Sequence, residues 1–200
     1  MSGSRLTPSD ELEVKARVPR PAALRRALVA AGARLQFRGR MSDRRFDRKR
    51  RLTRRDEVLR LRVYRPADGA PARGELAWKG PARARGAYRH RLELEAHVTD
   101  PDAMLEILRR LRFRESLRID RRVEIWRLGK AVVRIERYPD MDTLVEVEGA
   151  PGAIERAIAA SGLPREWFRP EALPHFVRAY EARTGRRARL TERGAGWGGG

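Results

Sequence analysis

The chain has 200 residues with a formal net charge of +19, no cysteine and only three histidines. This length allows one domain with a proper core, or two very small ones. The absence of cysteine excludes disulfides, thiolate catalysis and cysteine-based zinc sites, and three histidines make a His-rich metal centre unexpected. Any metal should therefore be a hard cation held by carboxylates.

The sequence contains no recognisable targeting or membrane signal. No apolar run approaches the roughly 18 residues of a membrane helix, and the first ten residues lack the apolar stretch of a signal peptide. We therefore expect a soluble, cytoplasmic protein. Residues 1–10 are expected to form a flexible lead, residues 11–184 a single domain, and residues 185–200 a disordered basic and Gly-rich tail.

The positive charge is unevenly distributed. Between Arg34 and Arg55 stand eleven Lys or Arg residues against two aspartates. Such a segment can track the phosphates of a nucleic acid or a polyphosphate. No recognition-helix pattern, zinc module or aromatic stacking set accompanies it, and the same charge can steer small phosphates into a cleft. The sequence leaves both interpretations open. A third explanation is that the arginine excess reflects a GC-rich coding bias.

Two kinds of periodicity predict the elements in chain order. Alternating charged and apolar side chains predict strands over residues 11–18, 34–47, 58–64, 75–79, 88–98, 113–126, 131–138 and 143–148. The second of these strands is expected to be broken at Gly39. Apolar residues at helical spacing predict helices over residues 21–31, 101–111, 151–161 and 171–184. At least six strands then carry an ionic face and an aliphatic face. The aliphatic faces should be buried beneath the helices, and the ionic faces should meet water or one another.

The ionic faces repeat a small set of patterns. They contain Glu-x-Glu, Arg-x-Arg and Arg-x-Glu-x-Glu at residues 11–13, 60–62, 91–95 and 146–148. A solvated outer face is the simplest explanation, but an antiparallel barrel that turns these faces inward explains their regularity better. Buried charges need partners or a ligand. We therefore predict an α+β fold around an antiparallel barrel with a charged tunnel, holding a polyanion and a metal.

Six short motifs follow one another along the chain. They are Glu-x-Glu-x-Lys at 11–15, Leu-Arg-x-Arg at 59–62, Lys-Gly-Pro at 79–81, Arg-x-Glu-x-Glu at 91–95, Arg-Ile-Glu at 134–136 and Glu-x-Glu-Gly at 146–149. In order and spacing, over about residues 10–184, they resemble the CYTH family, the triphosphate tunnel metalloenzymes. That family includes class IV adenylate cyclases, thiamine triphosphatases and inorganic triphosphatases. The resemblance implies an eight-stranded antiparallel barrel with flanking helices, whose tunnel binds a triphosphate and one or two divalent cations.

The resemblance also implies roles for individual side chains. The basic residues implied to hold phosphate oxygens are Lys15, Arg60, Arg62, Lys79, Arg91, Arg121 and Arg134, with Lys15 and Arg60 as the catalytic pair. The carboxylates implied to hold Mg²⁺ or Mn²⁺ are Glu11, Glu13, Glu136, Glu146 and Glu148. Glu93 and Glu95 either join these ligands or orient the basic side chains. For each residue the alternative is a structural ion pair.

The reaction depends on which nucleophile attacks the triphosphate. In a cyclase the ribose 3′-hydroxyl attacks the α-phosphate, and in a triphosphatase water attacks the terminal phosphate. Some hydrolytic members pair the signature lysine with a tyrosine from the second strand, and no tyrosine lies between Lys15 and Tyr64. Cyclases usually carry a second basic residue two positions after the one at Arg121, where this chain has Val123.

The leading interpretation is a class IV adenylate cyclase-like enzyme that forms cyclic AMP and pyrophosphate from ATP. The alternative is a triphosphatase acting on tripolyphosphate, thiamine triphosphate or a nucleoside triphosphate. A third interpretation is a non-catalytic binder of polyphosphate or RNA, motivated by the segment from Arg34 to Arg55. Glu146 and Glu148 speak against it, because a pure polyanion binder gains nothing from acidic ligands. The resemblance also implies a homodimer as an oligomeric state to test.

Overall fold

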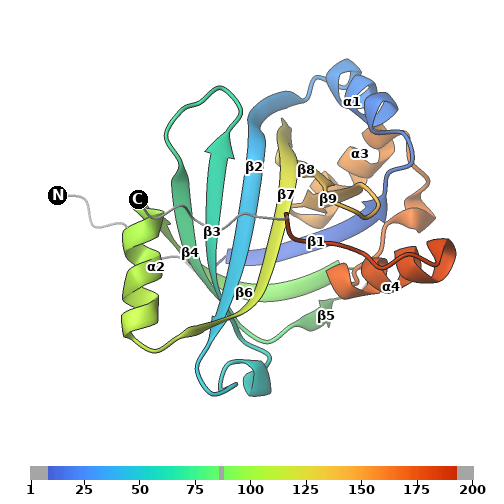
Figure 1. Cartoon of the computed structure of the whole chain (residues 1–200). Helices are drawn as coiled ribbons and strands as arrows, with labels where there is room; N and C mark the ends of the chain where they lie inside the picture. Colours follow the sequence, from blue (N-terminus) through green and yellow to red (C-terminus); the bar gives the residue numbers. More distant parts are fainter. Residues whose placement is uncertain (1–8, 86–87, 193–200) are drawn as a thin grey trace.

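The computed structural model describes residues 9–85 and 88–192 (Figure 1). Its strands are β1 (Ser9–Arg17), β2 (Arg34–Asp47), β3 (Val58–Pro66), β4 (Arg73–Lys79), β5 (Arg83–Arg85), β6 (Tyr88–Val98), β7 (Arg114–Leu128), β8 (Ala131–Arg137) and β9 (Leu144–Glu148). Its α-helices are α1 (Pro21–Ala30), α2 (Pro101–Arg110), α3 (Pro151–Ser161) and α4 (Leu173–Thr184). Short 3₁₀ turns lie at Thr53–Arg55 and Arg165–Trp167. The predicted elements are therefore all present, with ends displaced by a few residues.

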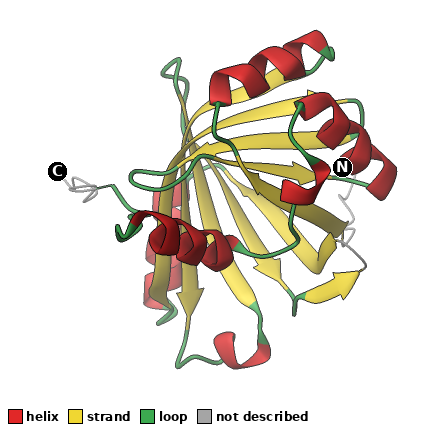
Figure 2. Ribbon diagram, turned by 90° about the vertical axis from the view of Figure 1, so that its right-hand side faces the viewer, coloured by secondary structure: helices red, strands yellow, loops and turns green. Residues whose placement is uncertain are grey.

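Eight of the strands close into an antiparallel barrel, which confirms the predicted fold. The strands follow the order β1-β9-β8-β7-β2-β3-β4-β6, and β6 pairs back with β1. Figure 2 shows the strands curving around the barrel with helices on the outside. Strand β1 closes the ring because its first half pairs with β6 and its second half with β9. The short β5 lies outside the ring and pairs only with the start of β6.

A backbone segment between α3 and α4 covers the seam where β1 leaves β6. Lys15 and Arg169 exchange two backbone hydrogen bonds of 2.8 Å, so the chain at Arg169 pairs with the part of β1 beyond its contact with β6. Helix α4 then begins at Leu173. This connection brings Ala172 and Leu173 to the wall of the barrel interior.

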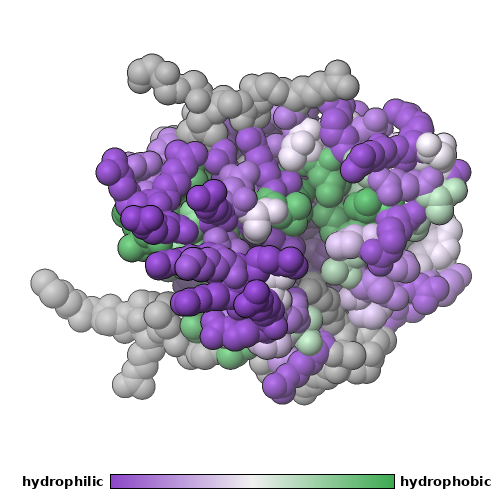
Figure 3. Space-filling model, turned by 60° about the horizontal axis from the view of Figure 1, so that its bottom comes forward, coloured by the Kyte–Doolittle hydropathy of each residue, from purple (hydrophilic) through white to green (hydrophobic). Residues whose placement is uncertain are grey.

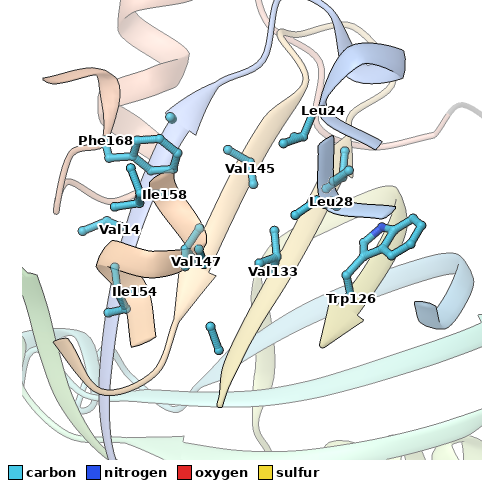
Figure 4. Packing of buried hydrophobic residues seen from close by; sticks show 14 of the residues in the cluster. Val14, Leu24, Leu28, Trp126, Val133, Val145, Val147, Ile154, Ile158 and Phe168 are labelled. Carbon is cyan, nitrogen blue, oxygen red and sulfur yellow. The ribbon is translucent and has the colours of Figure 1, made fainter. Parts of the chain in front are cut away.

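The main hydrophobic core lies outside the barrel, between its wall and helices α1 and α3. Figure 4 shows Leu24 and Leu28 from α1 and Ile154 and Ile158 from α3 packed over the outward side chains of β1, β8 and β9, such as Val133. A second core lies between α2 and strands β2 and β3. The alternation predicted from the sequence thus places aliphatic side chains outward, beneath helices, and ionic side chains inward.

The prediction that every aliphatic face is buried is wrong for β6. Leu92 and Leu94 on its outer face are 40% and 36% exposed. The reason is that α2 covers only the end of β6 at Val98, so no helix of the described part covers Leu92 and Leu94. Single exposed apolar side chains are common on protein surfaces.

One end of the barrel interior is filled by apolar side chains. Phe37, Met41, Tyr64, Val123 and Ile125 form a separate buried cluster there. Phe37 and Tyr64 meet edge to face with ring centroids 5.2 Å apart, and the guanidinium of Arg73 lies over both rings. This apolar plug fills that end of the interior in the described structure.

Strand β2 runs unbroken through Gly39, where the sequence predicted a break. A side chain at this position would lie 2.1 Å from the carbonyl oxygen of Arg65, which explains why glycine is needed here. The strand instead shows register irregularities against β7 between Leu35 and Phe37 and between Arg45 and Phe46.

The predicted boundaries at both ends of the domain need correction. Ser9 and Asp10 already belong to β1. The predicted disordered tail is wrong for residues 185–192, because Asp140 pairs with Arg189 and Leu190 packs beside Ile119. Residues 1–8 and 193–200 lie outside the described part. In the described part, no helix is both long and apolar enough to cross a membrane.

Candidate active site

The barrel encloses a charged tunnel with a cavity volume of about 230 Å³. Its cationic lining residues are Lys15, Arg45, Arg60, Arg62, Lys79, Arg91, Arg121 and Arg134. Its anionic lining residues are Glu13, Asp43, Glu75, Glu93, Glu95, Glu136, Glu146 and Glu148. Among the described residues, positive and negative lining side chains are therefore equal in number. The face in Figure 3, at the bottom of Figure 1, is likewise mostly hydrophilic, with apolar patches between charged side chains.

The two signs are not mixed evenly around the barrel. Strands β1, β8 and β9 contribute four carboxylates and only two cations, and we call this side the acidic wall. Strands β2, β3, β4, β6 and β7 contribute six cations and four carboxylates, and we call this side the basic wall. A ligand in the tunnel would therefore meet excess negative charge on one side and excess positive charge on the other.

Asp43 organises the centre of the basic wall. Its carboxylate accepts two hydrogen bonds from Arg62, of 2.6 and 3.0 Å, and one of 2.9 Å from Arg121. All three side chains are buried. Burial alone would raise the pKa of Asp43, but the guanidinium groups of Arg121 and Arg62 outweigh it and hold the pKa well below its usual range. Asp43 thus stays ionised and fixes both arginines.

Arg121 also links the two walls. Its Nε donates to Glu136 of β8 at 2.8 Å, and the Tyr138 hydroxyl donates to the same carboxylate at 2.6 Å. Burial first, and then the charge of Glu136, raise the pKa of Tyr138 well above its ordinary value. Tyr138 therefore remains a hydrogen-bond donor at neutral pH.

The acidic wall holds its carboxylates around two cations. Lys15 Nζ lies 3.1 Å from Glu13 and 2.5 Å from Glu146, and Arg134 donates to both Glu146 and Glu148. Burial alone would lower the pKa of Lys15, but the charges of Glu13 and Glu146 outweigh it and raise the pKa. Lys15 is therefore charged at neutral pH.

The buried donors of the tunnel that have no hydrogen-bond partner in the described structure include Nε of Arg60 and Nη1 of Arg121, and both side chains are less than 10% exposed. An unsatisfied buried N–H of a charged group is costly, and native proteins seldom leave one without a function. Donors of this kind in a tunnel suit the oxygens of an anion.

A model of the CYTH domain matches residues 9–157 of the sequence. The chain belongs to the CYTH family. Members of this family are typically enzymes that act on triphosphates and depend on a divalent metal. A search of curated protein sequences gave no significant match.

Several solved structures share this CYTH fold. A proposed adenylate cyclase from Vibrio parahaemolyticus has a TM-score of 0.71 at 17% identity, over 86% of this chain and 99% of that one. The PH1819 protein of Pyrococcus horikoshii OT3 has a TM-score of 0.67 at 20% identity, over 88% and 99%. HpAC1 of Hippeastrum is a proposed adenylyl cyclase described as having a dominant triphosphatase activity. It has a TM-score of 0.58 at 18% identity, over 90% of this chain and 98% of that one. At these identities the likeness concerns the fold alone.

The donor chemistry of the acidic wall suits a hard divalent cation. Glu13 and Glu148 stand directly opposite each other on β1 and β9, an arrangement of like charges that is unfavourable without a cation between them. Carboxylate oxygens are the ligands that Mg²⁺ and Mn²⁺ prefer. In the described structure no three acidic or histidine side chains converge as metal ligands would, because Lys15 and Arg134 lie between the carboxylates. The residues therefore have the chemistry of ligands for a hard cation, and in this structure Lys15 and Arg134 are their partners.

The tunnel brings together all seven basic residues that the family motifs single out. Lys79 pairs with Glu93, and Arg91 donates to Asp56 at 2.8 Å and to the carbonyl of Gly80 at 3.0 Å. Of the predicted carboxylates, Glu13, Glu136, Glu146 and Glu148 line the tunnel, as do Glu93 and Glu95. Glu11 lies in β1 opposite Arg91, and its side chain lies outside the described part.

Sequence reasoning missed several side chains of the tunnel. Asp43, Arg45, Tyr64, Glu75 and Tyr138 were not predicted as site residues. Met41, Asp43 and Arg45 occupy every second position of β2 and so share one face, which indicated that Asp43 and Arg45 point inward. Neighbouring arginines on the other face obscured this alternation in the sequence.

The segment from Arg34 to Arg55 does not form one basic surface. Arg45 faces the tunnel, and the buried Arg44 pairs with Glu115 on the outside at 3.3 Å. Arg38 and Arg40 lie near one end of β2, whereas residues 48–55 form a turn beyond its other end. That turn is held by the carboxylate of Asp47, which accepts hydrogen bonds from three backbone N–H groups and the Thr53 hydroxyl.

Proposed function

We propose that this protein is a metal-dependent enzyme that acts on a triphosphate bound in the tunnel. The observation that carries the proposal is the pair of buried, unsatisfied guanidinium donors, Arg60 Nε and Arg121 Nη1, within a lining of equal positive and negative charge. Because the lining is already neutral, a triphosphate must bring its own counter-ions. Divalent cations on the acidic wall would supply them.

Each wall has a distinct task in this proposal. Arg60, Arg62 and Arg121 of the basic wall bind and orient phosphate oxygens, with Lys79 and Arg91 near the same surface. Glu13, Glu146 and Glu148 of the acidic wall hold Mg²⁺ or Mn²⁺, which neutralises charge that develops on the phosphates. Lys15 and Arg134 exchange carboxylate partners for phosphate when the metal binds. Glu136 remains the carboxylate that positions Arg121, because it is 2% exposed and already bonded.

The composition of the tunnel favours hydrolysis of the terminal phosphate. The apolar plug fills one end of the interior, so a triphosphate is expected to enter from elsewhere, with its terminal phosphate reaching furthest. The cavity of about 230 Å³ has four apolar lining residues among those described, Val58, Ile119, Ala172 and Leu173, and the hydroxyls of its two tyrosines, Tyr64 and Tyr138, are bonded to Glu75 and Glu136. A purine base normally needs apolar or aromatic contacts. This favours tripolyphosphate, or a triphosphate whose organic part stays outside, over complete enclosure of ATP.

Cyclisation of ATP to cyclic AMP and pyrophosphate is the second candidate. It is supported by the likeness to the proposed adenylate cyclase of Vibrio parahaemolyticus over 86% of this chain. In that reaction the same basic wall would hold the β- and γ-phosphates as the leaving group, and the ribose 3′-hydroxyl would lie at the tunnel entrance. The two reactions would use the same tunnel residues. They would differ in how deeply the α-phosphate enters the tunnel.

One experiment separates these candidates. The protein is incubated with tripolyphosphate, ATP or thiamine triphosphate, each with Mg²⁺ or Mn²⁺, and the products are resolved by chromatography. Release of orthophosphate selects hydrolysis, and cyclic AMP with pyrophosphate selects the cyclase. If no triphosphate is turned over with either metal while binding in the tunnel persists, the proposed enzyme is rejected in favour of a non-catalytic binder.

A further inference from the structure

A second concentration of positive charge lies outside the barrel, at the end of β2 near α1. A groove there has a volume of about 930 Å³, compared with about 230 Å³ for the tunnel. Its lining contains six arginines, from α1, β2, β3, β7 and β8, and a single carboxylate, Glu124. None of these six arginines lines the tunnel.

Four of the arginines form a row across four adjacent strands. Arg65 on β3 pairs with Arg40 on β2, Arg40 pairs with Arg122 on β7, and Arg122 pairs with Arg137 on β8. Adjacent strands lie about 4.8 Å apart, so the row spans roughly 14 Å. Like charges directly opposite one another are destabilising in a sheet. An anion bound along such a row would offset this repulsion.

Glu124 and Glu192 pair with arginines of this groove. Glu124 is occupied by Arg25, which donates to it at 3.0 and 2.9 Å, and lies 3.7 Å from Arg38. Glu192 forms an exposed pair with Arg40 at 3.1 Å. No ion pair within the described residues neutralises Arg122 or Arg137, and both are exposed. The positive charge in the centre of the groove is thus available to a ligand.

We propose that this arginine groove is a second anion site, which binds a linear chain of phosphates such as inorganic polyphosphate along the row. A chain with evenly repeated charges matches arginines repeated at the strand spacing, and each guanidinium can bond two oxygens. The groove contains no aromatic lining residue among those described. Single-stranded nucleic acids are usually held by stacking on aromatic side chains, so the composition favours a phosphate chain without bases.

Binding of labelled medium-chain polyphosphate to the full-length chain tests the proposal. The groove variant carries Arg122→Gln with Arg137→Gln, and the matched control carries Arg109→Gln with Arg178→Gln on exposed surfaces of α2 and α4. Each groove arginine removed should weaken binding about tenfold, because a charge-assisted hydrogen bond is lost. The control variant should bind as the unmodified protein does. Equal affinity of the groove variant and the control would overturn the proposal.

Two further measurements separate this site from the tunnel and from nucleic-acid binding. The tunnel variant Arg60→Gln should keep its affinity for the polyphosphate, and loss of binding there would show that the chain is held in the tunnel instead. Single-stranded RNA of the same charge should bind more weakly, and equal binding with the same arginine dependence would reject a phosphate chain as the ligand. Turnover of tripolyphosphate, measured on the same samples, should be unchanged in the groove variant. Failure of turnover with intact groove binding would reject the proposed function alone.

Discussion

The two walls of the tunnel stabilise buried charge in different ways. On the basic wall, Asp43 accepts three hydrogen bonds from Arg62 and Arg121, and each arginine has a defined place. On the acidic wall, Lys15 and Arg134 are shared among Glu13, Glu146 and Glu148. The basic wall is therefore fixed by a central carboxylate, whereas the acidic wall is a group of carboxylates held together by cations that can be exchanged.

This difference indicates which wall changes when a ligand binds. Burying charges costs several kcal/mol per ion unless they are paired, so both walls must remain neutralised at every stage. The basic wall keeps its own partners and still has unused donors, Arg60 Nε and Arg121 Nη1. The acidic wall can release Lys15 and Arg134 only if another cation replaces them. Binding of triphosphate and metal should accordingly depend on each other.

Removing the link between the walls should have the largest effect. Arg121→Met leaves Asp43 and Glu136 buried without their shared partner, which should lower the free energy of unfolding by about 3–5 kcal/mol. It should also abolish binding of tripolyphosphate. Urea denaturation and calorimetric titration measure the two effects.

A second variant separates stability from binding at this position. Arg121→Met combined with Glu136→Gln removes the buried carboxylate that has lost its guanidinium partner and should recover part of the stability. Binding of tripolyphosphate should remain absent, because the donor is still missing. Recovery of binding together with stability would show that Arg121 is only a structural ion-pair partner.

The acidic wall should respond to charge removal in the opposite way. Glu148→Gln removes a proposed metal ligand, so metal-dependent turnover should fall at least about 100-fold. Binding of tripolyphosphate without metal should be unchanged or tighter, because a negative charge has been removed from the tunnel. Calorimetric titration with and without Mg²⁺ measures this contrast. Equal loss of binding with and without metal would place Glu148 in a structural role.

The sequence predicted the faces of most strands because their alternation is strict. In β3, for example, Arg60 and Arg62 face inward while Leu61 lies in the outer core, as the period of two requires. Such a pattern decides the side of a strand without knowledge of its neighbours. The candidate site could therefore be located from single strands together with the family motifs.

What could not be predicted depends on contacts between distant segments. Asp43 acquires its role only because β2 lies between β3 and β7, which carry Arg62 and Arg121. The row of arginines across four strands is likewise a matter of register, which no single segment contains. The packing of residues 185–192 depends on Asp120 and Asp140, whose backbone groups pair with Leu190 and Arg189. Strand alternation carries no information about these pairings.

The pH dependence of stability should show that Asp43, the central carboxylate of the basic wall, is ionised in the folded protein. The depressed pKa of Asp43 means that its contribution to stability is complete above the ordinary carboxyl pKa of about 3.9 and is lost as the pH falls through the lower folded value. Asp43→Asn should lower the free energy of unfolding by about 1.5–3 kcal/mol at neutral pH. The difference in the free energy of unfolding between Asp43→Asn and the unmodified protein should narrow at about pH 3 and below. Urea denaturation over this range measures it, and a difference that does not change with pH would contradict the ionised role of Asp43.

The smallest effect is expected at the exposed edge of the basic wall. Glu95 is 47% exposed and pairs with Arg60 at 3.2 Å, whereas Glu93 is 4% exposed and pairs with Lys79. Exposed ion pairs contribute about 0–1 kcal/mol, so Glu95→Gln should change KM for the triphosphate less than about fivefold. Glu93→Gln should change it more, because Lys79 loses a buried partner and is oriented less well. Steady-state kinetics on the two variants compare positions from the same strand and the same motif. A larger effect at Glu95 than at Glu93 would mean that the exposed carboxylate contacts the metal–triphosphate complex directly, rather than only holding Arg60 in place.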